Sequence, residues 1–551
     1  MDGCGGDGRW PRAVFMAFGT HGDVFPIAAL AAAFANDQQQ YTVVFITHSA
    51  HQSLSTHLAA SKVRYMSLAS PPALAAEQLD NTSYDSVQSD ADPESFSRRK
   101  EIIQTEHRKD CLASVEEVFG NDPSIHSDFI VINFFALEGW HLAELFQVKC
   151  IIAAPYFVPY SAPSSFERQF KQSFPLLYKY FQEAPPNTVC WTDITHWMWA
   201  LFMESWGLWR NGCLNLSPIP YTDPVTNLPL WHARSESPLL LYGFSKEIVE
   251  RPGYWPLSAH VCGFWFLPMA WQFSCDKCRE LFSGDFNSPF EGILCANHAG
   301  LEDFLMGSYS SLPIFIGLSS IGSMGFLRNP KAFLMVIKAV IESTDYRFIL
   351  FSSGYQPLDS AIRSVASLVV ESSVEAPALS SDSTLLFNNR LFCFSGSIPY
   401  SWLFPKCAAA IHHAGSGSTA AALFAGTPQV ACPFLLDQFY WAERLHWLGV
   451  APEPLKRQHL IPDIDDVTGV NKAADVLLGA IRSALSPEIK AQATVIAQRL
   501  ASEDPSSTGD DQAVSNVEVG GKHPRPSIKD PTRDKPLYRF ALSGDSAAVD
   551  P

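Results

Sequence analysis

The chain has 551 residues, of which 47% are hydrophobic and 17% charged, a composition that excludes wholesale disorder and is sufficient for several buried cores. Asp and Glu number 56 against 39 Lys and Arg, so the net charge of −17 argues against nucleic-acid partners and against binding to anionic membranes. Because no apolar run reaches the roughly 18 residues of a membrane span and no secretory signal is visible, we expect a cytoplasmic protein with at most peripheral membrane contact.

The first half of the chain alternates between strand and helix patterns. After a Gly-rich lead, the apolar run 13–18 ends in the turn GTHGD, a helical stretch runs from Val24 to Ala35, and a β-branched run follows at 41–46. This order is typical of a βαβ unit. The alternation continues with expected strands at 63–68, 128–135 and 148–155 and expected helices at about 96–119 and 138–147.

Tryptophans are dense between residues 160 and 260, and their spacing over 197–209 predicts a mostly buried helix. Two interpretations of this segment remain open. The first is a helix of the protein core, and the second is an apolar pocket that receives an acceptor molecule. The residues concerned are Trp191, Trp197, Trp199, Trp206 and Trp209.

A second strand and helix series begins near residue 312, and Asn329 with Pro330 supplies a cap and a first-turn proline for its first helix. The expected elements are strands at 312–320, 347–353, 391–397, 407–413 and 428–434, an insertion at 354–388, and helices at roughly 437–448 and 472–503. The predicted organisation is a flexible lead at 1–11, an N-terminal domain at 12–268, a linker at 269–303, a C-terminal domain at 304–503 and a disordered tail at 504–551.

The most informative segment lies between residues 411 and 452. An apolar strand ends at His412 and His413, a run of small residues follows to Thr419, and an Ala-rich helix begins. Free backbone N–H groups at a helix N-terminus bind anions, and glycines let a diphosphate approach the backbone closely. A second strand is followed by Asp437 and Gln438. Since ligands of open α/β sheets bind beyond the carboxyl ends of strands, we expect phosphate at the first segment and sugar hydroxyls at the second.

This segment resembles the nucleotide-sugar motif of UDP-glycosyltransferases with the GT-B fold. The sterol 3-beta-glucosyltransferase family, with a consensus similar to HHGGAGTT and then PFxxDQxxW, shows the most specific resemblance. The resemblance extends to GTHGDVFP at 19–26, IGLSSIGSM at 316–324 and SIPYSWLFP at 397–405. It implies an α/β protein of two Rossmann-like domains that face each other across a cleft, with the acceptor bound by the first domain and the UDP-sugar by the second.

Four positions depart from the family pattern, namely Ser319, Tyr400, Ala414 and Ser416. Serine and alanine keep the phosphate loops small or hydroxylic, so we expect donor binding to survive. Tyr400 stands where histidine is usual, a change that concerns recognition of the nucleotide base of the donor.

The resemblance also implies a role for each site residue. Asp23 would be the general base that removes the proton of the acceptor hydroxyl, with N-capping of a helix that begins near Val24 as the alternative. His21 is an alternative or assisting base. The implied donor-binding residues are Ser320, Ser397, Ile398, His413, Gly415, Ser416, Gly417, Ser418, Thr419, Asp437 and Gln438.

The expected activity is transfer of glucose, with inversion, from UDP-glucose to the hydroxyl of a sterol or another lipophilic acceptor. UDP would leave as charge develops on its phosphate, next to the N–H groups of residues 415–419. The resemblance implies that no catalytic metal is needed. Two alternatives stay open: transfer to a non-sterol small molecule, and a catalytically silent regulator that binds a sugar nucleotide.

A cysteine cluster lies outside the resemblance, in the expected linker. Cys275 and Cys278 form one close pair, and Cys295 and His298 form a second pair after sixteen residues. Two such pairs across a loop suit tetrahedral zinc, and the spacing is that of zinc ribbons. The alternatives are a structural zinc site or three free thiols with an exposed histidine.

Overall fold

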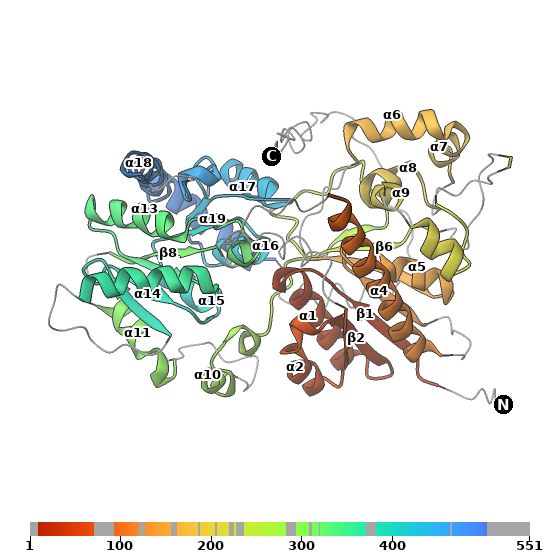
Figure 1. Cartoon of the computed structure of the whole chain (residues 1–551), viewed down its shortest axis with the longest axis horizontal. Coiled ribbons are helices and arrows are strands. Elements are labelled where there is room, and N and C mark those ends of the chain that lie inside the picture. The colour runs from red at the N-terminus through yellow and green to blue at the C-terminus, as the bar shows by residue number, and fades with distance from the viewer. Residues whose placement is uncertain are drawn as a thin grey trace. The chain divides into compact units, whose positions relative to one another are not determined.

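The computed structural model describes residues 9–70, 93–120, 127–155, 162–185, 188–203, 206–219, 225–226, 236–282, 294–307, 311–318, 320–370, 382–462 and 466–503 (Figure 1). Residues 1–8, most of the predicted loop at 69–95 and the predicted tail at 504–551 lie outside this description. The described chain divides into two compact units, the first reaching Trp265 and the second beginning at Phe266. Among the described helices, none combines the length and the apolar character that a membrane crossing requires.

The described part of the first unit is built on a seven-stranded sheet in the order β3-β2-β1-β4-β5-β6-β7, with every pair parallel. The strands are β1 (Arg12–Met16), β2 (Thr42–His48), β3 (Arg64–Leu68), β4 (Phe129–Ile132), β5 (Lys149–Ala154), β6 (Leu239–Tyr242) and β7 (Ala259–Val261). The chain moves outward from β1 to β3 and then returns to place β4 beside β1. Ligands of such sheets bind where the strand order reverses, here at the carboxyl ends of β1 and β4.

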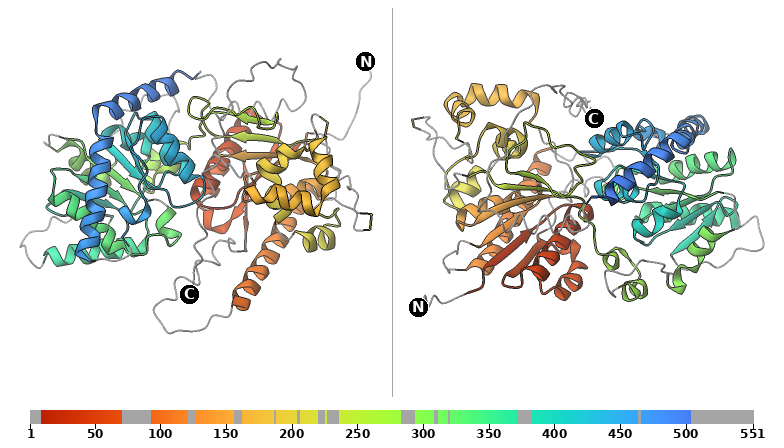
Figure 2. Two further views of the ribbon diagram at one scale, coloured as in Figure 1. Left: turned by 90° about the horizontal axis from the view of Figure 1, so that it is seen from above. Right: turned by 180° about the vertical axis from the view of Figure 1, so that it is seen from behind.

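Helices pack on this sheet because the connections between parallel strands must cross over it (Figures 1 and 2). α1 (His21–Asp37), α2 (Leu54–Ala60), α4 (Pro93–Phe119) and α5 (Glu138–Leu145) contact the strands. The other described α-helices of this unit are α6 (Ser164–Ser173), α7 (Pro175–Gln182), α8 (Trp191–Asp193) and α9 (Trp199–Met203). The predicted continuous helix at 197–209 is wrong, since π-helical turns flank α9 at 194–198 and 208–213.

The tryptophan-rich segment contributes to the core of the first unit. Trp197 is 1% exposed, and its ring meets that of Trp140 on α5 with centroids 4.8 Å apart. Trp206 and Trp209 are also buried, and the guanidinium of Arg108 lies 4.2 Å from the Trp206 ring centroid. These contacts favour the core interpretation of the segment, because the rings are already covered by the unit itself.

The described part of the second unit has a six-stranded sheet in the order β10-β11-β9-β8-β12-β13, in which only β10 is antiparallel. The strands are β8 (Ile314–Gly317), β9 (Phe348–Phe351), β10 (Ser383–Leu386), β11 (Leu391–Phe394), β12 (Ala409–His412) and β13 (Gln429–Ala431). The helices are α10 (Asp276–Leu281), α11 (Ala299–Met306), α12 (Ser320–Ser323), α13 (Pro330–Glu342), α14 (Gln356–Val370), α15 (Tyr400–Leu403), α16 (Ser416–Phe424), α17 (Gln438–Trp447), α18 (Val467–Ala484) and α19 (Pro487–Ala501). The predicted α/β class with two domains on parallel sheets is confirmed.

Two apolar layers cover the faces of the second sheet, and side chains alternate between them along each strand. Ile314 and Ile316 of β8 join α13, α14 and α18 in one layer. Phe315, between them, joins α11, α15 and α16 in the other. The carboxyl ends of the parallel strands are left at one edge, where loops can bind a ligand.

Two expectations for the second unit are corrected. The described residues of the segment 354–388 form the crossover helix α14 and the edge strand β10, so these parts belong to the α/β sheet unit and not to an insertion; residues 371–381 lie outside the described residues. The single helix expected at 472–503 is divided between α18 and α19, because Pro487 cannot continue a helix and the Ser486 side chain accepts the N–H of Ile489 as a new cap.

Candidate functional site

The predicted donor residues all follow one row of residues at the edge of the second sheet. In register, this row runs Phe394, Phe351, Gly317, His412 and Ala431 across β11, β9, β8, β12 and β13. The strand order reverses between β8 and β12, so Gly317 and His412 mark the switch point at which ligands bind. The loops with Ser397, His413 and Asp437 therefore leave the same edge.

The loop after β12 is shaped by two special backbone positions. Ala414 has a φ of +62°, the left-handed region that glycine adopts most easily. Gly415 is the N-cap of α16, and a Cβ on it would lie 2.4 Å from Nε2 of His413. The imidazole therefore lies directly against the Gly415 backbone, which no larger residue allows. The small-residue run thus holds the His413 ring at the start of α16.

His413 and Thr419 each carry a buried polar atom that is unsatisfied within the described chain. His413 is 6% exposed and Thr419 is fully buried, yet neither His413 Nδ1 nor Thr419 Oγ1 has a hydrogen-bond partner among the described residues. Such atoms normally have partners, because an unsatisfied buried polar group costs free energy. Burial lowers the pKa of His413 to about 3, so its imidazole is neutral and carries one N–H. Both atoms lie beside the N-terminus of α16, where anions bind.

The preceding histidine has a structural role. The backbone N–H of Ala414 donates to His412 Nδ1 at 3.0 Å, and His412 Nε2 lies 2.9 Å from Oε1 of Gln429. Both ring nitrogens are occupied and the residue is fully buried. His412 is therefore packed within the protein beside His413, with neither ring nitrogen available to a ligand.

Ser418 and Tyr400 are linked at the first turn of α16. Tyr400 stacks on Phe404 with centroids 4.7 Å apart, its hydroxyl is hydrogen-bonded to Ser418, and burial raises the pKa of its phenol to about 12. Tyr400 is therefore neutral and packed against the apolar core. Ser418 uses its hydroxyl within the protein, so its backbone N–H is the group that an anion would meet.

The segment before α17 is fixed by Gln438. Its Oε1 accepts the backbone N–H groups of Phe434 at 2.9 Å and Leu435 at 3.2 Å, which leaves the side-chain NH₂ as a donor. Asp437 occupies the N-cap position without making a capping bond, and its Oδ2 accepts from Nε1 of Trp441 at 3.1 Å. The Asp437 side chain therefore does not cap α17.

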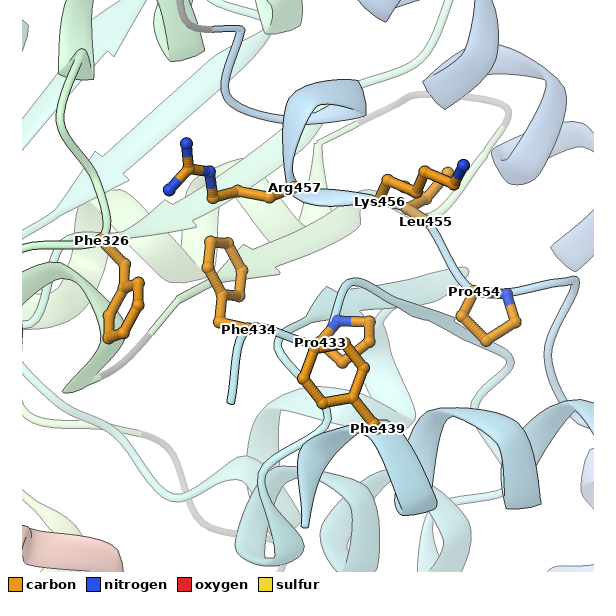
Figure 3. A pocket seen from close by; sticks show the side chains of 8 residues that line it. All are labelled: Phe326, Pro433, Phe434, Phe439, Pro454, Leu455, Lys456 and Arg457. Carbon is orange, nitrogen blue, oxygen red and sulfur yellow. The ribbon is translucent and has the colours of Figure 1, made fainter. Parts of the chain in front are cut away.

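A hollow of about 340 Å³ lies next to this segment. Figure 3 shows its lining, which is mainly apolar and comes from three parts of the second unit: Phe326, Pro433, Phe434, Phe439, Pro454, Leu455, Lys456 and Arg457. None of the predicted donor residues lines it. The polar groups expected to meet a sugar nucleotide belong to the neighbouring loops instead.

For the predicted donor residues Ser320, Ser397 and Ile398, the structure shows no described side chain that is free to donate to a ligand. Ser320 begins α12, but its side chain and the whole of Ser319 lie outside the described residues. Ile398 is 3% exposed and belongs to the apolar core, so only its backbone can face a ligand. The Ser397 hydroxyl donates to the backbone carbonyl of Gln272 at 3.0 Å.

Asp23, in the first unit, lies in the first turn of α1. The helix begins at His21 with Thr20 as N-cap, so the alternative in which Asp23 itself is the N-cap is wrong. Oδ2 of Asp23 accepts from the Thr20 backbone N–H at 2.6 Å and from the Thr20 hydroxyl at 2.8 Å. This arrangement is the capping box, which the spacing Thr-x-x-Asp produces. His21 is exposed and stacks on Phe25, with centroids 3.4 Å apart.

The loop before α1 lies in close contact with the Asp23 carboxylate. Gly19 has a φ of +109°, and a Cβ on it would lie 2.6 Å from Asp23 Oδ2, so the position requires glycine. Burial raises the pKa of Asp23 to about 6, and the hydrogen bonds from Thr20 oppose this shift only in part. A carboxylate with a pKa near neutrality is suited to general base catalysis.

Comparison with known proteins shows what the chain as a whole is similar to. A sterol 3-beta-glucosyltransferase of Arabidopsis thaliana is 24% identical over 505 residues, which cover 90% of this chain and 66% of that protein. A sterol 3-beta-glucosyltransferase of Candida albicans is 26% identical over 324 residues, covering 59% of this chain and 18% of that protein. The predicted resemblance to sterol 3-beta-glucosyltransferases is thus confirmed as a similarity that extends over most of this chain. The chain spans less than two thirds of the length of either relative.

Other similarities concern parts of the chain or the fold. Residues 365–473 match the family described as erythromycin biosynthesis protein CIII-like, C-terminal domain. The crystal structure of the glycotransferase of kitacinnamycin superposes with a TM-score of 0.52 at 14% identity, covering 93% of this chain and 99% of that one. The calicheamicin glycosyltransferase CalG4 gives 0.50 at 14% identity, covering 93% and 98%. The predicted GT-B fold is thereby confirmed.

Two residues that support the Asp23 turn were not predicted from the sequence. Asn133 follows β4 and is fully buried; its Nδ2 donates to the carbonyls of Phe18 at 2.8 Å and Asp23 at 3.2 Å. Nε2 of His51 lies 3.1 Å from the carbonyl of Gly19. A polar residue directly after a buried strand could have indicated Asn133, whereas nothing local indicates His51.

Proposed function

We propose that this chain is an inverting glycosyltransferase that moves glucose from UDP-glucose to the hydroxyl of a sterol or another lipophilic alcohol. The observation that carries the proposal is the loop of residues 413–419, where two buried polar atoms without described partners lie at a helix N-terminus on the switch point of the sheet. The homology to sterol 3-beta-glucosyltransferases supports glucose as the sugar and a sterol as the acceptor.

In the proposed reaction, the acceptor hydroxyl attacks the anomeric carbon of glucose while its proton passes to Asp23. A new glycosidic C–O bond forms as the bond between that carbon and the phosphate oxygen breaks, so the configuration inverts. The electron pair leaves with UDP. In this proposal, His413, Thr419 and the N–H groups at the start of α16 stabilise the charge that develops on the phosphate, and fixed donors of this kind need no reorganisation to do so.

The proposed sugar contact of Gln438 is testable apart from the phosphate contacts. Gln438→Ala should raise the dissociation constant of UDP-glucose by about three- to tenfold and leave that of UDP unchanged, since one neutral hydrogen bond contributes about 1 kcal/mol. Calorimetric titration with both ligands measures this. Gln438→Glu is the matched variant, because it can still accept the N–H groups of Phe434 and Leu435 but cannot donate. Equal losses for UDP and UDP-glucose would refute the sugar assignment.

The pH dependence of activity should report Asp23. The base must be a carboxylate, and its pKa of about 6 means that protonation removes activity as the pH falls below 6. We expect kcat/KM to fall about tenfold per pH unit on the acid side and to be level above neutrality. His413, with a pKa of about 3, should add no limb in this range. An acid limb near pH 4, where ordinary aspartates titrate, would contradict the assignment.

The decisive experiment for the proposed function is an acceptor screen with UDP-glucose, read by mass spectrometry. The full chain is incubated with sterols and, in parallel, with macrolide-like alcohols. The second arm is included because an O-mycaminosyltylonolide 6-deoxyallosyltransferase of Streptomyces fradiae is 24% identical over 390 residues. A sterol that gains one hexose supports the proposal, and products only in the second arm favour the non-sterol alternative. Binding of UDP-glucose without any product would support the silent regulator.

A further inference from the structure

Three cysteines and one histidine converge in the second unit, outside the residues assigned to donor binding. Cys275 precedes α10 and Cys278 lies within it, whereas Cys295 precedes a single 3₁₀ turn that ends at His298. One ligand atom from each of the four lies within 4.8 Å of the ligand atoms of all the others. Residues twenty positions apart in the chain are thus folded into one compact group.

The separations match the edges of a tetrahedron around zinc. With Zn–S bonds near 2.3 Å and Zn–N bonds near 2.0 Å, the expected S···S and S···N separations are about 3.8 and 3.6 Å. Sγ of Cys275 lies 3.6 Å from Sγ of Cys295, and Nδ1 of His298 lies 3.4 Å from the sulfurs of both Cys278 and Cys295. A disulfide would require about 2.05 Å between the sulfurs. We propose that Cys275, Cys278, Cys295 and His298 bind one structural zinc ion.

The surroundings of the four residues suit a closed site. Cys278 is fully buried, and Cys295 and His298 are 8% and 5% exposed, within the apolar layer that also contains Phe273 and Phe394. Four protein ligands complete the tetrahedron and leave no position for substrate, so this zinc would be structural and not catalytic. The alternative of an exposed histidine is excluded by its burial.

The site is joined to a donor loop through Ser274, the residue before the first cysteine. The Ser274 backbone N–H donates to the Ser397 carbonyl at 3.1 Å, and the Ser397 N–H donates to Ser274 Oγ at 2.8 Å. A Cβ on Gly396 would lie 2.6 Å from the same Oγ, so the two segments are in close contact. We infer that the zinc site fixes the loop at 395–398. This inference rests on the proposed function, in which Ser397 and Ile398 belong to the donor-binding residues and, by the resemblance, lie where the chain would meet the uracil of UDP.

The metal itself is tested by elemental analysis of the full chain purified without a metal-binding tag. We expect one zinc per chain, and cobalt in its place should give the visible absorption of tetrahedral thiolate coordination. Cys275→Ser, the least buried change, and Cys278→Ser should lose the metal. Cys407→Ser is the matched control, because Cys407 is buried in the same apolar layer but is not one of the four ligands. A zinc content near zero without cobalt uptake, or a disulfide between Cys275 and Cys295, would overturn the proposal.

Chelation of the wild-type chain keeps the test valid if the variants fail to fold. Removal of the metal should expose three additional thiols to a thiol reagent and lower the thermal midpoint, whereas unchanged thiol reactivity would contradict the site.

The link between the zinc site and the loop at 395–398 has a test of its own. Removal of the metal should weaken the binding of UDP several-fold and leave the binding of pyrophosphate unchanged. Ser274→Ala should weaken UDP binding in the same way while it retains its zinc. Equal UDP affinity with and without metal would overturn that link. If the untreated chain binds no UDP, the proposed function fails while the zinc analysis stands.

Discussion

Asp23→Asn is expected to lower turnover by about a hundredfold or more, the usual contribution of a general base, while the fold and UDP binding are retained. The amide oxygen can still accept the hydrogen bonds that Thr20 donates to Asp23, so the start of α1 should be preserved. The amide cannot take the proton of the acceptor hydroxyl. Single-turnover rates with UDP-glucose and the acceptor from the screen measure the loss, and calorimetric titration with UDP measures binding.

Two variants serve as controls for Asp23. Asp37→Asn changes an exposed carboxylate at the other end of the same helix and should leave turnover unchanged. His21→Ala tests the alternative base; because His21 stacks on Phe25 and makes none of the Thr20 contacts, we expect most of the activity to remain. If turnover is near normal in Asp23→Asn, or if it is lost in His21→Ala alone, Asp23 is not the base and acts only as the acidic member of the capping box.

His413→Ala should weaken UDP and UDP-glucose by the same factor, about ten- to a hundredfold, because both ligands carry the diphosphate. A hydrogen bond to a charged group contributes about 1.5–3 kcal/mol, and His413 Nδ1 has no described partner that would compete for it. The ring lies against Gly415, so its removal leaves the backbone of the loop in place. Titrations with both ligands and a thermal scan of the free protein test this prediction. It fails if His413→Ala loses binding of UDP-glucose but keeps full binding of UDP.

Thr419→Val is the companion variant. It removes the buried hydroxyl that has no partner in the described chain while keeping a branched side chain at a fully buried position. The free protein should be as stable as the wild type or slightly more so, and UDP binding should weaken. Unchanged UDP binding in Thr419→Val would contradict the phosphate assignment of Thr419.

The sequence by itself determined the features that depend on neighbours along the chain. Runs such as 13–18 and 407–413 indicated buried strands because their apolar character is continuous. The small residues from Ala414 to Thr419 indicated the start of a helix, and the two pairs around residues 275–298 indicated side chains that converge. Phosphate binding at the first and a metal at the second remain predictions. The Thr-x-x-Asp spacing and the Ser486–Pro487 pair were also local signals; reading them would have placed the starts of α1 and α19 correctly.

Only the tertiary structure decided which of these local features meet. The register of β8, β12 and β13 brings their carboxyl ends together, and no pattern along the chain states that register. Asn133 reaches Phe18 across 115 positions, and Ser274 meets Ser397 across 123. The burial that raises the pKa of Asp23 and lowers that of His413 arises in the same way. Such contacts are set by side-chain packing between distant segments, which single-chain periodicity does not encode.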